Sequence, residues 1–510
     1  MKLLAVICTS VCVLFPLMLS AQTVVLQSKT GNVHVEGTLV EYDGEFYRVK
    51  TNLGVLTIDG RTVNCSGDGC PSTQDMTSRF SVSASGDLGR TLIPALLEAY
   101  SLSLDGEVTI ESPTLNGQTF KIQDSGENDV AEIDIKVTPE NIAYTDLAKG
   151  GDLIIATSRL PSRSEAASVK NPEQKQVLAS DGIIAAVSSA NPLNTISMAH
   201  LRKILTGDIT NWREVGGPDI DIDLYLPTGN DGFKNVLRDS RIGLKPSQLT
   251  STAIQLDSLA NVADAAAANP FGLGITSFSN LRNATALGLK ASCGIYSTPS
   301  IFTLKSGSYP LTYNHYFFRP KQRLPVFARE FLDFAKSDQA QNVIRATGYA
   351  DLAISTLSLD HQGLRLANAI GQADKEVPLS TVLEMVQLLN GAKRLSTTFR
   401  FRPSSKTLNT QSKQNASLLV SGLILGNYAD KQVHIIGFTD SAGSSAQNIA
   451  LAKKNAQAVL NSIISTAPEN SLDDVDFQVN GFGEASPLAC DDTKAGKQVN
   501  RRVEIWIKES

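Results

Sequence analysis

The sequence predicts a multidomain protein in which a small N-terminal β module is followed by two α/β modules. Its 510 residues suffice for three or four domains of about 100–200 residues each. Hydrophobic residues make up 42% and charged residues 19%, which supplies packed cores and excludes a disordered chain. From about residue 78, strands begin to alternate with helices, which is typical of α/β folds.

Composition excludes several function classes. The chain has 46 Lys and Arg against 51 Asp and Glu, a formal net charge of −5 without the basic surface that nucleic-acid binding needs. The six Cys and five His show no zinc or iron–sulfur spacing, so we expect no metal and no cofactor. No Gly-x-Ser-x-Gly elbow and no His-Asp-Ser grouping occurs, so we expect no enzyme. The histidines lie in unrelated segments and are expected at surface or structural positions: His34, His200, His315, His361 and His434.

Residues 1–21 have the pattern of a secretory signal peptide. A short basic start precedes an apolar run over residues 3–19 and the small residues Ser20 and Ala21. Leu19 is unusual three positions before the cut, so the cleavage position stays open. The alternative is a retained membrane anchor. No other stretch reaches the ~20 apolar residues of a spanning helix, so we expect an exported, soluble protein.

Residues 22–77 form the predicted β module. Alternating residues over 33–40 and 46–51 flank Asp43-Gly44, a strong hairpin signal.

Export permits disulfides. Cys65 and Cys70 bound a turn-rich loop and are expected to pair. Cys293 and Cys490 lie in different predicted domains, and we expect them to be free and partly buried rather than bridged.

Residues 78–355 are predicted as an α/β unit. A strand at 80–83 leads through a glycine-containing loop into a helix that begins near Leu92. Further predicted elements are buried strands at 152–156 and 182–187, a helix at 197–207 capped by Ser197 and ended by Gly207, and an amphipathic helix at 326–334.

The loop after the first strand is a candidate anion site. Gly86 and Gly89 let backbone N–H groups approach a ligand, the helix N-terminus favours negative charge, and Ser85 adds a hydroxyl. Two roles are open for Asp87, a contact to the ligand or an ordinary N-cap, because an Asp before a helix often caps it.

The run over residues 191–217 is distinctive, and with it residues 78–355 resemble the phosphate-type substrate-binding proteins of ABC importers. The resemblance implies a two-lobed type II periplasmic-binding fold whose lobes are joined by crossing strands and close on a tetrahedral oxyanion. It also implies an ABC permease as a candidate partner.

The resemblance assigns the oxyanion contacts residue by residue. The first loop supplies Ser85, Gly86 and Asp87; the segment after the strand at 152–156 supplies Ser158 and Arg159, where the family often has Ser-Asp; and the third loop supplies Thr228, Gly229 and Asn230. That third loop lacks the family's Arg and carries Asp231. A cleft that binds an oxyanion and a cleft that is degenerate or repurposed therefore both stay open.

Residues 356–392 are predicted as a helical connector with its own small core, divided by Pro378. The segment from residue 391 has 14 Lys and Arg against 11 Asp and Glu, unlike the acidic remainder, which supports a separate domain over 393–510. Its expected elements are strands at 398–402, 433–437, 477–479 and 503–507, with one helix ending near 425 and another at 447–465.

Three ordered motifs within residues 395–508 resemble the OmpA-like domain that grips peptidoglycan noncovalently. They lie at 437–443, 481–487 and 500–504. The resemblance implies that Asp440 meets the ammonium of diaminopimelate and that Asn448 also contacts the stem peptide. Asn455 stands where the family has an Arg for the ligand carboxylate. Arg501 and Arg502 match the last motif, although one of them is expected to pair within the sheet.

Together these patterns predict a periplasmic protein associated with the cell wall and outer membrane. It binds an oxyanion, most simply phosphate, and anchors itself to peptidoglycan stem peptides. The alternative is a wall-associated adaptor whose binding-protein module recognises another ligand.

Overall fold

The computed structural model describes residues 23–509, except 30, 32, 43–44, 72–76, 115, 151–152, 170–173, 229–230, 374–376, 403–404 and 406. The predicted signal peptide, the turn Asp43-Gly44, and Gly229 and Asn230 therefore lie outside the described residues. Within the described residues no helix is long and apolar enough to cross a membrane.

The N-terminal module is an antiparallel sheet with the strand order β4-β3-β2-β1-β5. Its strands are β1 (Thr23–Ser28), β2 (His34–Tyr42), β3 (Phe46–Thr51), β4 (Gly54–Asp59) and β5 (Val63–Ser66). The predicted disulfide Cys65–Cys70 is confirmed. The module touches the next domain through Glu45, whose Oε2 lies 2.7 Å from a guanidinium nitrogen of both Arg323 and Arg329.

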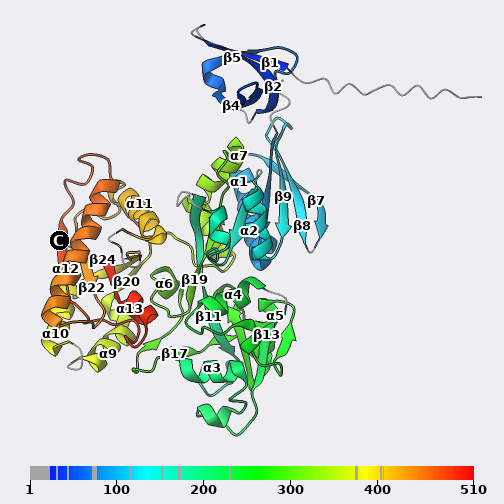
Figure 1. The fold of residues 1–510 in the computed structure, drawn as a ribbon. Coiled ribbons are helices and arrows are strands. Elements are labelled where there is room, and N and C mark those ends of the chain that lie inside the picture. Colours follow the sequence, from blue (N-terminus) through cyan, green and yellow to red (C-terminus); the bar gives the residue numbers. More distant parts are fainter. Residues whose placement is uncertain are drawn as a thin grey trace, which may run out of the picture.

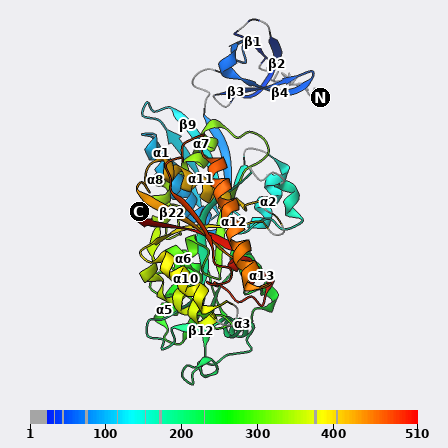
Figure 2. The same ribbon diagram turned by 90° about the vertical axis from the view of Figure 1, so that its left-hand side faces the viewer.

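The central domain has two lobes that share one long sheet, with the order β14-β13-β15-β11-β19-β10-β6-β9-β8-β7. The crossing strands β11 (Lys175–Val187) and β19 (Thr312–Phe318) pair antiparallel and join the lobes (Figures 1 and 2). Lobe 1 consists of β6 (Ser78–Ala84), a π-helical turn (Leu88–Leu92), α1 (Ile93–Ser103), β7 (Glu107–Thr114), β8 (Gly117–Gln123), β9 (Asp129–Val137), α2 (Glu140–Lys149), β10 (Leu153–Thr157), α7 (Val326–Phe334) and α8 (Asp338–Ala346).

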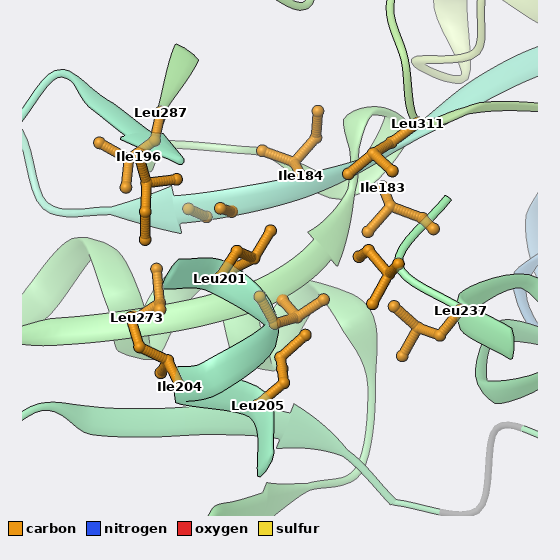
Figure 3. Close-up of a cluster of buried hydrophobic side chains, with 14 of the residues drawn as sticks. Ile183, Ile184, Ile196, Leu201, Ile204, Leu205, Leu237, Leu273, Leu287 and Leu311 are labelled. Carbon is orange, nitrogen blue, oxygen red and sulfur yellow. The ribbon is translucent and has the colours of Figure 1, made fainter. Parts of the chain in front are cut away.

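Lobe 2 is built around a single apolar core, part of which is shown in Figure 3. Its main elements are β12 (Thr195–Ser197), α3 (Met198–Thr206), β13 (Asp223–Pro227), α4 (Asp231–Asp239), β14 (Ile254–Leu256), α5 (Leu259–Ala268), β15 (Gly272–Ser277), β16 (Thr285–Ala286), β17 (Gly288–Lys290), β18 (Tyr296–Ser297) and α6 (Ile301–Lys305). Ser197 caps α3 as predicted, since its side chain accepts a hydrogen bond from the His200 amide, and Gly207 ends the helix with φ of +83°.

The C-terminal domain has a sheet in the order β20-β21-β24-β22-β23. Its strands and helices are β20 (Thr356–Ser358), β21 (Lys393–Phe399), α11 (Thr410–Ile424), β22 (Lys431–Phe438), α12 (Ser445–Thr466), β23 (Phe477–Gly481), α13 (Lys494–Asn500) and β24 (Arg502–Glu509). The strand predicted at 398–402 thus lies mainly earlier in the chain, because β21 pairs with β24 from Lys393 to Phe399. Helices α11 and α12 cover one face of the sheet.

The segment predicted as a helical connector contains α9 (Gly363–Gln372) and α10 (Leu379–Leu389). Its predicted independent core is wrong. The apolar sides of both helices pack on the second face of the C-terminal sheet, against side chains that include Ile436, Phe438 and Trp506. The connector therefore completes the C-terminal domain rather than standing apart from it.

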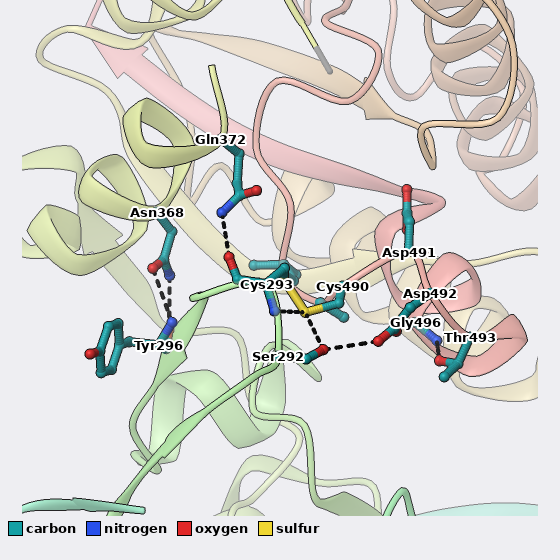
Figure 4. The surroundings of a disulfide bond; sticks show 12 residues. Ser292, Cys293, Tyr296, Asn368, Gln372, Cys490, Asp491, Asp492, Thr493 and Gly496 are labelled. Atoms are coloured by element: carbon teal, nitrogen blue, oxygen red, sulfur yellow. Dashed lines mark hydrogen bonds between the residues drawn. A yellow bond between two sulfur atoms is a disulfide. The ribbon is translucent and has the colours of Figure 1, made fainter. Parts of the chain in front are cut away.

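The expectation for Cys293 and Cys490 is also wrong, because they form a disulfide between lobe 2 and the C-terminal domain (Figure 4). They are separated by 197 positions, so the sequence gives no sign that the two chain segments meet. Ser292 Oγ donates to Asp492 at 2.9 Å beside the bridge, and Gln372 Nε2 donates to the Cys293 carbonyl at 2.9 Å. The C-terminal domain is therefore fastened to lobe 2.

Helix α12 lies so close to its sheet that two strand positions have no room for a side chain. A Cβ atom on Gly437 would overlap the carbonyl oxygen of Ala452, and one on Gly481 would overlap the amide nitrogen of Lys453. We expect Gly437→Ala to destabilise the C-terminal domain by about 1–3 kcal/mol, the usual cost of overpacking. Hydrogen exchange of the β22 amides in the full chain measures this change.

The matched control is Gly371→Ala in α9, where an added Cβ has nothing within 4 Å. Because alanine restricts the unfolded chain, this variant should be neutral or more stable by up to about 1 kcal/mol. Equal β22 protection in the two variants would contradict the close contact at Gly437.

Candidate functional site

A small polar pocket lies between the lobes, where β11 and β19 meet the ends of β6, β10 and β15. Its volume is about 20 Å³. That is room for a group the size of one or two water molecules. Both lobes and the crossing strands supply its walls: Ser85, Gly86, Asp87, Leu88, Ser158, Asp181, Phe233, Val236, Leu259, Ser277, Ser279, Asn280, Tyr313, His315 and Tyr349.

The predicted loop at residues 85–87 forms one wall of this pocket. The Ser85 amide donates to the Ala156 carbonyl at 3.1 Å, and the Leu88 amide donates to the Ser85 carbonyl at 3.0 Å, which fixes the turn. Gly86 has φ of +42°, a conformation that favours glycine. The chain enters helix here, and the first amides of a helix have no partner within it. The loop can therefore offer N–H groups to an anion.

Asp87 spans the cleft rather than capping the helix. It occupies the N-cap position, but its side chain makes no capping hydrogen bond. Instead, Asn280 Nδ2 from lobe 2 donates to Asp87 Oδ2 at 3.1 Å. Burial raises the pKa of the Asp87 carboxyl, although Arg90 and the Asn280 hydrogen bond oppose this. Asp87 is thus a cross-lobe contact and a pocket acceptor at once.

Two titratable residues of the pocket were missed by the sequence analysis. Asp181 on β11 is 1% exposed, and its carboxylate accepts hydrogen bonds from Ser279 Oγ at 2.6 Å and from the Tyr313 hydroxyl at 3.2 Å. His315 on β19 is 3% exposed; its Nδ1 lies 3.1 Å from Ser158 Oγ and its Nε2 lies 3.6 Å from Asp181 Oδ2.

The expectation that His315 lies apart from any site is therefore corrected. Asp181 carried a usable signal, since a carboxylate directly before the buried strand 182–187 needs partners. His315 carried none, because its meeting with Ser158 depends on how β19 crosses β10 and β11.

Arg159 does not line this pocket. Its Nε lies 2.9 Å from Glu140 Oε2, and its Nη1 and Nη2 donate to the two oxygens of Glu165 at 2.7 and 2.8 Å. Arg159 holds the pKa of Glu165 at about 2. Glu140 Oε1 in turn accepts the Ser158 amide at 2.5 Å. The cation predicted to face the ligand is instead paired with two carboxylates, behind the loop that presents Ser158.

Thr228, the described residue of the third predicted loop, does not line the pocket. Thr228 closes on its own lobe, with its amide and hydroxyl donating to the Leu256 carbonyl at 2.7 and 3.0 Å. Gly229 and Asn230 lie outside the described residues. The segment 277–280 supplies polar groups of lobe 2 in its place, which the sequence analysis did not anticipate.

The charge of the pocket differs from the sequence expectation. Among its described lining residues are the carboxylates of Asp87 and Asp181 and the imidazole of His315, but no Lys or Arg. Burial raises the pKa values of Tyr313 and Tyr349 well above their usual range, so both hydroxyls stay protonated and able to donate. The site therefore combines hydroxyl and amide donors with two carboxylate acceptors. This suits a small ligand that both accepts and donates hydrogen bonds.

The predicted wall-binding residues gather around the loop after β22. Asp440 is 5% exposed; its Oδ1 accepts the Ala442 amide at 3.1 Å, and its Oδ2 lies 3.0 Å from Arg501 Nη1. Asp491 Oδ2, in the segment just before α13, accepts the Ser441 amide at 2.5 Å and so holds the same loop. Asp440 and Arg501 are therefore neighbours.

The remaining members of this set take different positions. Asn448 on α12 is 2% exposed, and its amide lowers the pKa of Glu484, which burial raises more strongly. Asn455 is half-buried further along α12, and Lys454 beside it is exposed. Arg502 is 1% exposed, and its Nε donates to Glu504 at 2.7 Å. Arg502 is therefore the residue that pairs within the sheet, and its assignment as a wall contact is corrected.

Comparison with known proteins finds similarities for both large modules. A family model described as "PBP superfamily domain" matches residues 118–339, and one described as "OmpA family" matches residues 400–501. The chain is 28% identical over 242 residues to the phosphate-binding protein PstS of Bacillus subtilis, covering 46% of this chain and 77% of that protein. It is 33% identical over 107 residues to the probable lipoprotein YiaD of Escherichia coli, covering 21% of this chain and 46% of that protein.

A crystal structure of an ABC-type phosphate transport receptor from Vibrio cholerae is 21% identical, covers 53% of this chain and 98% of its own, and gives a TM-score of 0.41. By the family models, residues 118–339 are similar to the PBP superfamily and residues 400–501 to the OmpA family, and both are families of binding proteins rather than enzymes.

Proposed function

We propose that the interlobe pocket binds a small protonated oxyanion, hydrogen phosphate, and that the OmpA-family domain holds the protein on peptidoglycan in the periplasm. The observation that carries the ligand proposal is the meeting of Asp87 and Asp181 with the loop at Ser85 in one pocket. The phosphate-binding protein named among the relatives supports it.

The two carboxylates act as selective acceptors in this proposal. A phosphate ion near neutral pH keeps a proton that it can donate to a carboxylate, whereas sulfate has none and would face like charges. Ser85, Ser158 and the first amides of the helix supply donors to the other oxygens. A tetrahedral ion exceeds the present pocket volume, so its entry requires the lobes to part at the Asp87–Asn280 contact.

The wall proposal rests on the neighbouring charges of Asp440 and Arg501. The diaminopimelate of a stem peptide carries an ammonium and a carboxylate on one carbon, so a carboxylate beside a guanidinium can hold both groups. Asn455 adds a neutral amide where the family has an Arg, which we expect to weaken the hold on the ligand carboxylate.

A protein held on the wall cannot diffuse freely to a membrane permease. Local capture or sensing of phosphate near the wall therefore fits this combination of domains better than shuttling to an ABC permease. The adaptor alternative is not favoured by the comparisons, because the central domain matches a phosphate-binding protein over most of that protein's length.

The first prediction of this proposal concerns Asp87→Asn. This change removes an acceptor for the ligand proton, so the preference for phosphate over sulfate should fall by about tenfold or more, the contribution of one charge-assisted hydrogen bond. Because the pKa of Asp87 is raised, the unmutated carboxyl gains a proton at a higher pH than an ordinary Asp. The preference should therefore also fall as the pH is lowered through that pKa.

Calorimetric titration of the full chain with each anion measures this preference. Asp105→Asn is the matched control, since Asp105 is exposed in lobe 1 and its φ of +54° suits Asn equally well. An unchanged preference in Asp87→Asn would reject the role of Asp87, and no phosphate binding by the unmutated chain would reject the ligand.

The second prediction concerns the wall contact. Asp440→Ala should release the full chain from purified sacculi, because Asp440 is the carboxylate assigned to the stem ammonium. Asn455→Arg should increase the bound fraction by giving the ligand carboxylate a bidentate partner. Co-sedimentation with sacculi measures both, with the exposed Asp473→Ala as the control. An unmutated chain that stays in the supernatant would reject the anchor, and sedimentation of Asp440→Ala at the control level would reject this site.

A further inference from the structure

A second, much larger cavity lies where lobe 2 and the crossing strands face the C-terminal domain. Its volume is about 880 Å³, within the range of sites for small organic ligands. It shares Ser158, Val236 and Tyr313 with the small pocket, so the two spaces adjoin. Its C-terminal wall comes from β21 and from the segments at 409–415 and 495–499.

Two guanidinium groups reach this cavity from different domains. Arg241 of lobe 2 lines it, has a buried Nη2 without a hydrogen-bond partner, and makes no hydrogen bond or ion pair with any described residue. Arg400 from the C-terminal domain donates to the carbonyls of Ser306 and Gly307 at 3.4 and 3.1 Å, but its buried Nε has no partner.

The positive charges of Arg241 and Arg400 repel each other. Burial, together with the positive charges of Arg502 and Arg241 and against the opposing effect of Glu504, lowers the pKa of Arg400 to about 10. Burial also lowers the pKa of Arg241, and the Asp492 carboxylate acts in the other direction. Neither guanidinium has a carboxylate within ion-pair distance among the described residues. Positive charges held close together in a partly buried site without ion-pair partners favour an anion from outside the chain.

The other cations on these walls are already neutralised. Arg159 pairs with Glu140 and Glu165, as described above. Lys305 Nζ lies 2.8 Å from Asp351, and Arg238 Nε lies 2.7 Å from Asp239. Arg241 and Arg400 are therefore the cations of the described lining that are left for a ligand.

We propose that this cavity binds a small organic or condensed anion carrying at least two anionic groups, held between Arg241 and Arg400. The volume favours a ligand larger than a single phosphate ion. Phosphoryl groups and carboxylates share the required chemistry, since a guanidinium binds either through two parallel hydrogen bonds. Because the two arginines come from different domains, the ligand would bridge the interface that Cys293–Cys490 fastens.

The experiment is calorimetric titration of the full chain in saturating inorganic phosphate, which occupies the small pocket if that pocket binds it. One arm uses tripolyphosphate as the phosphoryl probe, and the other uses a soluble wall tetrapeptide with several carboxylates. We expect one probe to bind, and its affinity to fall about tenfold or more in Arg241→Gln and in Arg400→Gln, since each removes a charge-assisted pair.

The controls separate this site from the others. Arg213→Gln removes an exposed arginine of lobe 2 that pairs with Asp219, and should leave probe binding unchanged. The wall tetrapeptide is titrated in the Asp440→Ala background, which removes its proposed contact in the C-terminal domain, so this proposal and the proposed function fail independently. Arg400 is half-buried, and if Arg400→Gln lowers the melting temperature, Arg241→Gln decides the outcome. Absence of binding for both probes, or equal affinity in Arg241→Gln and Arg213→Gln, would overturn the proposal.

Discussion

The attachment of the C-terminal domain to lobe 2 and to the crossing strands is the constraint on which the rest of the arrangement depends. The bridge Cys293–Cys490 fixes one end of this interface. At the other end, Gln414 exchanges two hydrogen bonds with the backbone of Val177 on β11, at 3.2 and 3.0 Å. This interface encloses the large cavity and brings Arg400 beside lobe 2. Without it the central domain and the C-terminal domain would be linked only by the chain that joins them.

The small pocket is suited to its ligand by the placement of hydrogen-bond donors and acceptors, since its described lining has two carboxylates and no Lys or Arg. Its acids are supported from behind, since Asp181 accepts bonds from Ser279 and Tyr313 while Asn280 reaches across to Asp87. The cation nearest to it by sequence, Arg159, contributes indirectly, because it stabilises the buried Glu140 that anchors the Ser158 amide. A ligand that carries its own proton meets this lining without unpaired charge. The same lining presents like charges to a fully ionised oxyanion.

The order of strands and helices and the residues of short local motifs could be predicted from the sequence. Ser85, Gly86 and Asp440 stand at strand ends followed by helices, so their positions follow from the local chain. His315 could not be predicted, because its partners come from β10 and β11, which are distant in the sequence. Cys293 and Cys490 were misjudged for the same reason, since domain docking leaves no periodic pattern. Arg159 was misassigned because nothing local shows that Glu140 already lies beside it.

Among the described contacts, the ion pairs of Glu45 connect the N-terminal module to lobe 1 alone. Its carboxylate meets Arg323 and Arg329, which lie just before and within α7 of lobe 1, whereas the C-terminal domain is bridged to lobe 2. Any rotation of one lobe against the other therefore swings the N-terminal module relative to the C-terminal domain. When the C-terminal domain is held in place, a rotation of the lobes about the crossing strands β11 and β19 displaces the N-terminal β module.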